Sequence, residues 1–258
     1  FTVNSTLYNN DNFIILDEPE VVENYIGQFE YMWNDGINGI FNSVAPITNS
    51  LIQIDDSITI ENAFSPNGGV SDSVVKFIND AKHNIYFCIN TFTDYTNIAA
   101  ALINRHQNHI IVKGVGDVKK SLVDVQGDIV PYNLMTAAGI EFKLRAANKG
   151  ELHSKFVIRD IGTPAASVLT GSFNWTESAN SSNNENIIII KNYPALANSY
   201  FNEYLRIAEY VNNSGALLPA FVIDNAYFKP QPANDITRLA YKLPAGVVSV
   251  KITVFTVS

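Results

Sequence analysis

The sequence has a single cysteine, no apolar run of membrane-spanning length and little positive charge. Cys88 lies in the apolar segment 85–89, so we expect a buried, unreactive thiol, and no disulfide can form within the chain. The strongest apolar run is the four isoleucines at 187–190, whereas a helix that spans a bilayer needs about 20 apolar residues. The sequence therefore excludes a disulfide scaffold and predicts no transmembrane helix.

Positive charge is scarce, with 17 Lys and Arg against 25 Asp and Glu and a formal net charge of -8. Non-specific binding of nucleic acid usually depends on a broadly basic surface, which this balance excludes. Four cations are nevertheless close in sequence: Lys143, Arg145, Lys149 and Lys155. They leave a local basic cleft open, although each alone is expected to be a solvated charge. The many Asn, Ser and Thr residues favour a secreted or periplasmic protein.

An internal repeat relates residues 2–16, TVNSTLYNNDNFIIL, to residues 176–190, TESANSSNNENIIII. Asp11 falls opposite Glu185 in this alignment, and after a slip of one residue Tyr25 falls opposite Tyr200. Each copy continues into a segment with helical apolar spacing. We therefore expect each copy to contain an Asn-rich loop, a buried strand, a turn with proline and an amphipathic helix.

Strand and helix patterns alternate through the middle of the chain, at 258 residues long enough for a substantial core. Expected strands cover 58–60, 85–92, 110–115, 141–144, 152–159, 168–169 and 186–190. Expected helices cover 72–82, 97–104 and 129–138. This alternation predicts an α/β fold with a mixed β-sheet flanked by helices on both faces. The proline-containing, alternating segment 213–258 predicts a small β-rich C-terminal extension.

The residues that carry chemistry are concentrated between 153 and 185. They are His153, Lys155, Asp160, Ser172, Asn174 and Glu185. Residues two apart on an extended chain share a face, so His153 and Lys155 project together, and Ser172 and Asn174 do the same if their segment is extended. Each of these residues alone has an ordinary structural explanation, but the combination is specific.

The group of side chains suits a phosphodiester. Lys155 and Asn174 are expected to hold its non-bridging oxygens and to stabilise charge in the transition state. His153 is expected to attack phosphorus or to move a proton. Glu185 is expected to hold the imidazole in one tautomer.

The motif resembles the signature of the phospholipase D superfamily, which is His-x-Lys, four residues, Asp and a following Gly-Ser step. The similarity runs from about residue 57 to 210 and is nearest to the bacterial endonuclease-like branch, with 64–66, 90–93 and 170–176 as further points of likeness. In that family two halves pack about a two-fold axis, one histidine becomes phosphorylated and the other acts as acid and then base. The resemblance implies no metal or other cofactor. It also implies that Ser172 supports the phosphate site and that Asp160, although part of the motif, is a structural hydrogen-bond partner.

The resemblance accounts for one complete half, so the chain is expected to be the C-terminal part of a two-motif member. Residues 1–36 would be the last strand and helix of a preceding half, 37–56 a connector, 57–212 the complete domain and 213–258 the extension. The second histidine would come from a missing N-terminal segment, another chain or a homodimer mate. Asp11 is expected to orient that second histidine.

We therefore expect a metal-independent phosphodiesterase that acts through a phosphohistidine intermediate. Its substrate would be nucleic acid, as in a nuclease, or phospholipid, as in a phospholipase D or phosphatidyl transferase. A phospholipid site would need an apolar rim, for which Phe92, Tyr95 and Trp175 are the candidates. The alternative from another class is a catalytically incomplete binding or structural protein.

Overall fold

The structure is a computed structural model that describes residues 9–33, 50–66, 68–93, 97–118, 131–145 and 150–212. Most of the expected connector and the whole expected β-rich extension at 213–258 lie outside the described residues. Tyr95 and Lys149 also lie outside them. The comparison of predicted and observed elements therefore concerns the rest of the chain.

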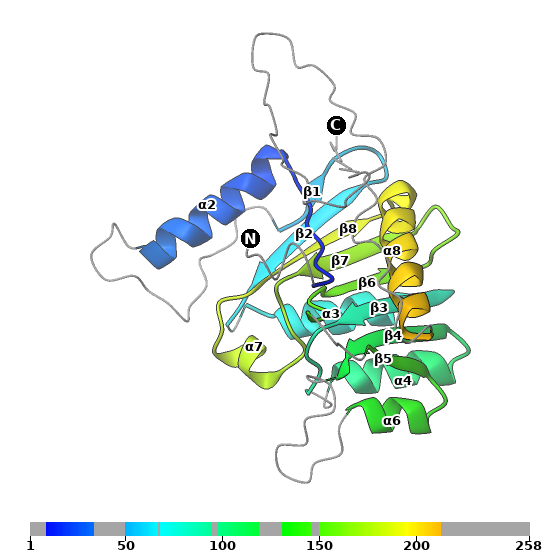
Figure 1. Ribbon diagram of the computed structural model, residues 1–258. Helices are drawn as coiled ribbons and strands as arrows, with labels where there is room; N and C mark the ends of the chain where they lie inside the picture. Colours follow the sequence, from blue (N-terminus) through cyan, green and yellow to red (C-terminus); the bar gives the residue numbers. More distant parts are fainter. Residues whose placement is uncertain are drawn as a thin grey trace, which may run out of the picture.

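The described residues form one 8-stranded sheet in the order β1-β2-β8-β7-β6-β3-β4-β5 (Figure 1). Its strands are β1 Ile52–Gln53, β2 Thr59–Phe64, β3 Asn84–Ile89, β4 Ile111–Asp117, β5 Glu141–Arg145, β6 Phe156–Arg159, β7 Ser167–Gly171 and β8 Asn186–Lys191. Neighbouring strands from β1 to β3 along this order are antiparallel, whereas β3, β4 and β5 are parallel. The predicted mixed sheet is thus confirmed.

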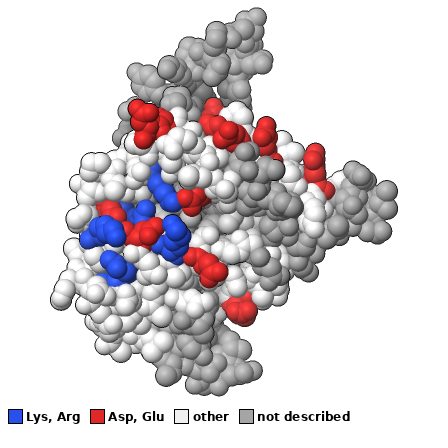
Figure 2. Space-filling view, turned by 180° about the vertical axis from the view of Figure 1, so that it is seen from behind, with Lys and Arg blue, Asp and Glu red and all other residues white. Residues whose placement is uncertain are grey.

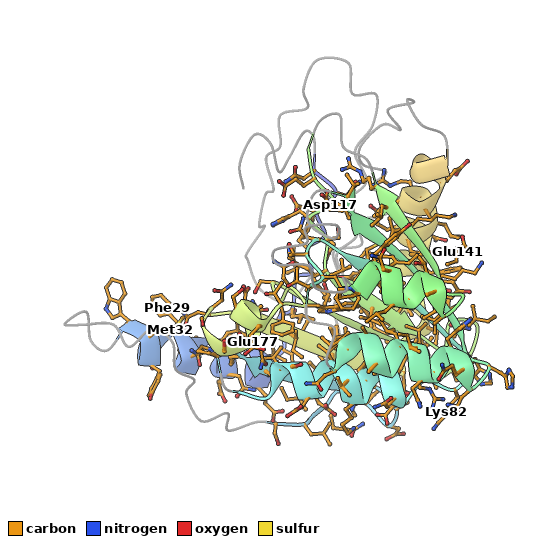
Figure 3. All side chains as sticks on the ribbon, turned by 90° about the horizontal axis from the view of Figure 1, so that it is seen from below. Phe29, Met32, Lys82, Asp117, Glu141 and Glu177 are labelled. Atoms are coloured by element: carbon orange, nitrogen blue, oxygen red, sulfur yellow. The ribbon has the colours of Figure 1, made fainter. Side chains whose placement is uncertain are left out.

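Helices cover both faces of this sheet, as predicted. The helices are α2 Pro19–Trp33, α3 Val70–Asn79, α4 Ile98–Gln107, α6 Pro131–Ala137, α7 Glu177–Ser181 and α8 Pro194–Asn212. One core lies between the sheet and α3, α4 and α6, and a second core lies between the sheet and α8. The view from below shows α3 and α4 on one side of the strands and α8 on the other (Figure 3). In the same view α2 projects away from the body of the domain, with Phe29 and Met32 towards its far end.

Close packing in the first core depends on a glycine in β4. An added Cβ at Gly114 would come within 2.0 Å of the Phe87 ring, which is fully buried and stacks obliquely on Trp175 and Phe142. The second core contains Cys88, which is fully buried as predicted, and burial raises the pKa of its thiol.

Two expected strands differ from the structure. The first repeat copy forms no strand at 12–16, where Phe13 is 46% exposed and Ile15 is 47% exposed. The described part of the first copy makes one isolated bridge, between Asn10 and Leu152 just before this segment, and residues 12–16 pair with none of the described strands. The same bridge explains why β6 begins at Phe156 rather than at 152, because the chain before it pairs with Asn10 instead of with a sheet neighbour.

Two short elements were not predicted. The Asn-rich loop of the second copy contains α7, whose N-cap Thr176 accepts a hydrogen bond from the Ala179 amide at 3.1 Å. The strand β1 lies in the segment predicted as a connector and pairs with β2. Both elements are stabilised by contacts that apolar periodicity does not reveal.

Charged side chains on the described surface are mixed in sign. Seen from behind, Lys and Arg side chains gather with Asp and Glu side chains among them (Figure 2). Asp80, for example, contacts Lys76 at 3.3 Å and Arg159 at 3.5 Å. Of the four cations that left a basic cleft open, Lys143 pairs with Glu141 at 2.9 Å and Arg145 is buried. No helix among the described residues is long and apolar enough to cross a membrane.

Candidate active site

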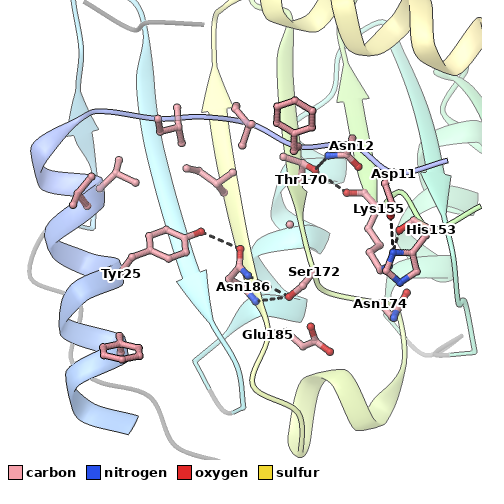
Figure 4. Close-up of a pocket in the computed structure, with 18 of the residues that line it drawn as sticks. Asp11, Asn12, Tyr25, His153, Lys155, Thr170, Ser172, Asn174, Glu185 and Asn186 are labelled. Atoms are coloured by element: carbon pink, nitrogen blue, oxygen red, sulfur yellow. Dashed lines mark hydrogen bonds and ion pairs between the residues drawn. The ribbon is translucent and has the colours of Figure 1, made fainter. Parts of the chain in front are cut away.

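A cavity of about 960 Å³ lies between the first repeat copy and the ends of three sheet strands (Figure 4). Its apolar wall comes from the segment before α2 and from α2 itself: Phe13, Ile14, Leu16, Val21, Val22, Ile26 and Phe29. Its polar wall contains five of the six motif residues: His153, Lys155, Ser172, Asn174 and Glu185. The structure therefore brings these five predicted residues together.

The backbone just before His153 is held by side chains from two strand ends. The Leu152 amide donates to Asp117 at 2.9 Å, and its carbonyl accepts from the Asn90 amide group at 2.8 Å. The backbone amides of His153 and Ser154 both donate to the carbonyl of Asn10, at 2.9 and 2.7 Å. These contacts fix the direction in which the imidazole leaves the chain.

The imidazole of His153 is oriented by Asp11. The His153 Nδ1 and Asp11 Oδ1 atoms are 2.7 Å apart, and these residues are 142 positions apart in sequence. Our expectations that Glu185 orients His153 and that Asp11 serves another histidine are thus corrected. The acid comes from the first repeat copy, whose segment before α2 passes over β8 and brings Asp11 to His153 (Figure 4). A carboxylate at Nδ1 keeps the proton on that nitrogen and leaves Nε2 with a free lone pair.

Lys155 lies deep in the cavity and is only 7% exposed. Its ammonium donates to the carbonyl of His153 at 2.6 Å. Burial lowers the pKa of Lys155 from 10.5 to about 8, and the negative charges of Asp11 and Glu185 oppose that shift. Thr170 donates to the Lys155 carbonyl at 3.0 Å and accepts from Asn12 at 2.8 Å, which ties this strand to the first repeat copy.

Ser172 is held against β8 by a close approach of two backbones. A Cβ on Gly171 would come within 2.1 Å of the Asn186 carbonyl, and Gly171 has a φ of 151°, so only glycine fits here. The Ser172 amide donates to that same carbonyl at 3.0 Å. The Gly-Ser step therefore places the serine hydroxyl at the cavity edge of the sheet.

Asn174 is fixed by its own carbonyl oxygen. Its Oδ1 accepts from the Thr91 amide at 3.2 Å, so its NH₂ group remains available as a donor on the cavity side. Glu185 is anchored through its backbone, which exchanges hydrogen bonds with Ser65 at 2.9 and 3.2 Å. The Glu185 carboxylate accepts from Asn183 at 3.1 Å and lines the cavity.

Asp160, the sixth motif residue, is away from the cavity. It is 3% exposed, follows β6 and accepts from the amides of Lys82 and His83, each at 2.7 Å. The carboxylate thus holds the turn before β3, which fits the structural role that the motif implied and argues against a catalytic one.

Sequence reasoning missed two contributors to the cavity, assigned one to the wrong partner and placed two others wrongly at its rim. Asp11 was found through the repeat but assigned to the wrong histidine, and Asn12 and Tyr25 gave no signal beyond their repeat alignment. The rim candidates Phe92 and Trp175 are buried in the first core and do not line the cavity. Within the part of the chain that the structure describes, three or more His, Cys, Asp or Glu side chains do not gather in a way that could hold a metal ion.

Known proteins resemble this chain in sequence. "Mitochondrial cardiolipin hydrolase" of Danio rerio is 26% identical over 129 residues, which are 50% of this chain and 52% of that protein. "Phospholipase D" of Rickettsia prowazekii is 28% identical over 151 residues, which are 56% of this chain and 65% of that protein. The chain thus spans between about half and two thirds of the length of these relatives.

A crystal structure of a phospholipase D family member, Nuc from Salmonella typhimurium, superimposes with a TM-score of 0.52 at 27% identity. The match covers 59% of this chain and 95% of that one. A family model described as "Cardiolipin synthase, PLD-like domain" matches residues 74–207, just over half of the chain. The chain therefore belongs to the PLD-like domain family of phosphodiesterases.

Proposed function

We propose that this chain contributes one half of a phosphodiesterase site in which His153 is the nucleophile and no metal takes part. The observation that supports this most is the convergence of His153, Lys155, Ser172 and Asn174 on one cavity, with Asp11 at 2.7 Å from Nδ1 of the imidazole. This arrangement supplies a nucleophile, its orienting acid and donors for phosphate oxygens.

The reaction follows from these positions. Lys155 and Asn174 bind the non-bridging oxygens of a phosphodiester and stabilise the charge that develops on them. The Nε2 lone pair of His153 attacks phosphorus, an N–P bond forms and the P–O bond to the leaving group breaks. The leaving oxygen takes the electron pair and a proton from a second histidine. Water, deprotonated by that second histidine, then attacks phosphorus, breaks the N–P bond and restores His153.

The second histidine is proposed to come from another PLD-like half whose sheet packs on α2. The sequence repeat aligns α2 with α8. In this alignment Val22, Phe29 and Trp33 correspond to Ala197, Tyr204 and Ala208. The three α8 residues are buried on the sheet of this half. In contrast, Phe29 and Trp33 are each 58% exposed and stack on each other with ring centroids 5.8 Å apart. Val21 and Tyr25 of this face pack on this half, whereas the part of the face that holds Val22, Phe29 and Trp33 is exposed.

Glu185 supports the same proposal independently. Its repeat partner Asp11 orients a histidine of the opposite copy, so Glu185 is expected to orient the histidine of the other half. His153 is the one histidine among the described residues that line the cavity. A preceding segment, another chain or a second copy can supply the missing histidine.

The charges of the site favour a phospholipid over nucleic acid as substrate. Lys155 is the one Lys or Arg among the described cavity residues, and Asp11 and Glu185 lie close to it. A polynucleotide is held through several phosphates by several cations, whereas one phosphodiester group needs few. Release of headgroup from phosphatidylcholine vesicles, compared with cleavage of a single-stranded oligonucleotide, distinguishes the two substrates.

The test uses bis(4-nitrophenyl) phosphate, whose leaving group needs no proton from a second histidine. In excess chelator we expect a burst of about one nitrophenolate per chain, as for a covalent intermediate. His153→Ala should abolish the burst, and His83→Ala, which alters an exposed histidine away from the cavity, should leave it unchanged. A parent chain without a burst, or a burst that survives His153→Ala, contradicts the proposal, and the first result would favour a catalytically incomplete binding protein.

A further inference from the structure

A chain of polar groups runs from α2 to the serine of the Gly-Ser step (Figure 4). The Tyr25 hydroxyl donates to Oδ1 of Asn186 at 3.0 Å. The amide group of Asn186 then donates from Nδ2 to the Ser172 hydroxyl oxygen at 3.2 Å, and the Asn186 backbone amide donates to the same oxygen at 3.1 Å. The chain therefore connects the helix of one repeat copy to the phosphate site of the other.

These contacts determine what the Ser172 hydroxyl can do. A hydroxyl oxygen accepts two hydrogen bonds and donates one. Asn186 occupies both acceptor positions of Ser172. Among the described residues no acceptor faces the remaining Ser172 proton, and Ser172 lines the cavity. The proton is thus available to an oxygen of a bound phosphate.

The orientation of the Asn186 amide decides this outcome. With the amide turned over, Oδ1 would face Ser172 and accept its proton, so the hydroxyl would no longer donate into the cavity. Tyr25 opposes that state because its phenol donates to Oδ1 and would be left without this acceptor. Phe64 packs edge-on against the Tyr25 ring with centroids 5.0 Å apart and fixes its position. Burial raises the pKa of Tyr25 to about 12, so the phenol keeps its proton at neutral pH.

We infer that Tyr25 is a positioning residue that, through Asn186, holds Ser172 as a donor to a non-bridging oxygen of the bound phosphodiester. The inference rests on the proposed function. It assigns a role in the chemistry to α2, in addition to its place in the cavity wall and in the proposed interface.

The test measures inhibition of the nitrophenolate burst by inorganic phosphate. Tyr25→Phe keeps the ring and removes the hydroxyl, and Ser172→Ala removes the donor itself. Loss of one hydrogen bond to a charged group should raise the inhibition constant about tenfold in each variant. The double variant should bind phosphate no more weakly than Ser172→Ala alone, because Tyr25 acts only through Ser172. Tyr31→Phe, on the same helix but outside the cavity lining, should match the parent.

Three results would overturn the inference. Tyr25→Phe could match Tyr31→Phe, or the effects of Tyr25→Phe and Ser172→Ala could multiply in the double variant. The inhibition constant of Tyr25→Phe could also rise only in step with a lower unfolding temperature, which would mean that Tyr25 merely docks α2. These results leave the His153-dependent burst intact, whereas failure of the proposed function removes the burst from the parent chain as well.

Discussion

The contact between His153 and Asp11 joins residues 142 positions apart and orients the imidazole on which the proposed chemistry depends. Residue types and spacing were sufficient to predict the five motif residues that line the cavity. The partner of the imidazole was not predictable, because the acid that reaches it comes from the opposite repeat copy. Sequence adjacency favoured Glu185, whereas the loop that crosses the cavity places Asp11 within hydrogen-bond distance.

Asp11→Asn should reduce the rate of the nitrophenolate burst by about a hundredfold or more, since an amide can donate to Nδ1 and favour the wrong imidazole tautomer. Asp17→Asn, an exposed change in the same segment, is the matched control. Nitrogen NMR of labelled histidine reports the tautomer directly. A His153 signal that shifts with Glu185→Gln and not with Asp11→Asn would restore the original assignment.

Lys155 should give the site a pH dependence. Burial lowers its pKa to about 8, and we propose that the charged form binds phosphate, so binding should be full below about pH 8 and weaken as the pH rises above it. The inhibition constant of dimethyl phosphate, which keeps one charge over this range, measures the effect. Lys155→Arg remains charged, so its inhibition constant should not rise at pH values above about 8. A parent profile that stays flat to pH 10 would contradict the role of the ammonium.

At the scale of elements, the alternating pattern of the middle of the chain was sufficient to predict the sheet and most of its helices. Apolar periodicity works there because each element has one face on a core. It failed at 12–16, whose apolar residues Phe13 and Ile15 are exposed in this half. It also failed at α7, which depends on the cap formed by Thr176, and at β1, whose pairing with β2 is a nonlocal contact.

Gly171 lets the end of β7 approach the backbone of β8 closely beside the site. Gly171→Ala should lower the free energy of unfolding by roughly 2–4 kcal/mol, because the new methyl group would meet the Asn186 carbonyl at 2.1 Å and the backbone has an unfavourable φ of 151°. Denaturant unfolding measures the change. Gly27→Ala, in α2 with no atom within 4 Å of the new Cβ, should instead raise stability by about 0.5–1 kcal/mol. Equal stabilities for the two variants would show that β7 and β8 are not held this closely.

The molecule as a whole presents one PLD-like domain, and we propose that α2 is the last helix of another half. The cores on both faces of the sheet are closed by α3, α4, α6 and α8, whereas α2 projects from the body (Figures 1 and 3). The sequence repeat predicts such an organisation through the likeness of α2 to α8, and this stays a prediction. It could not show which atoms cross between the copies, because that depends on how the first copy lies over the cavity.

Replacing both exposed aromatic residues of α2, as Phe29→Ser with Trp33→Ser, should leave the stability of this half within about 0.5 kcal/mol of the parent. Assembly with a second half should be lost, and with it repeated turnover, while the single burst persists. Both effects are measured on the assembled form that turns over repeatedly. Its mass in sedimentation reports assembly, and its steady-state rate reports turnover. Tyr31→Ser, on another side of the same helix, is the control. Unchanged mass and turnover in the double variant would rule out α2 as the interface.

The central claim is that His153 becomes covalently bonded to phosphorus. The most direct measurement is mass spectrometry of the chain after brief reaction with bis(4-nitrophenyl) phosphate in chelator and an alkaline quench, which preserves an N–P bond. The account predicts one 4-nitrophenylphosphoryl adduct, because the second nitrophenyl ester stays on phosphorus; it should be located on His153 and absent from His153→Ala. An adduct on any other residue, or a nitrophenolate burst with no adduct, would contradict it.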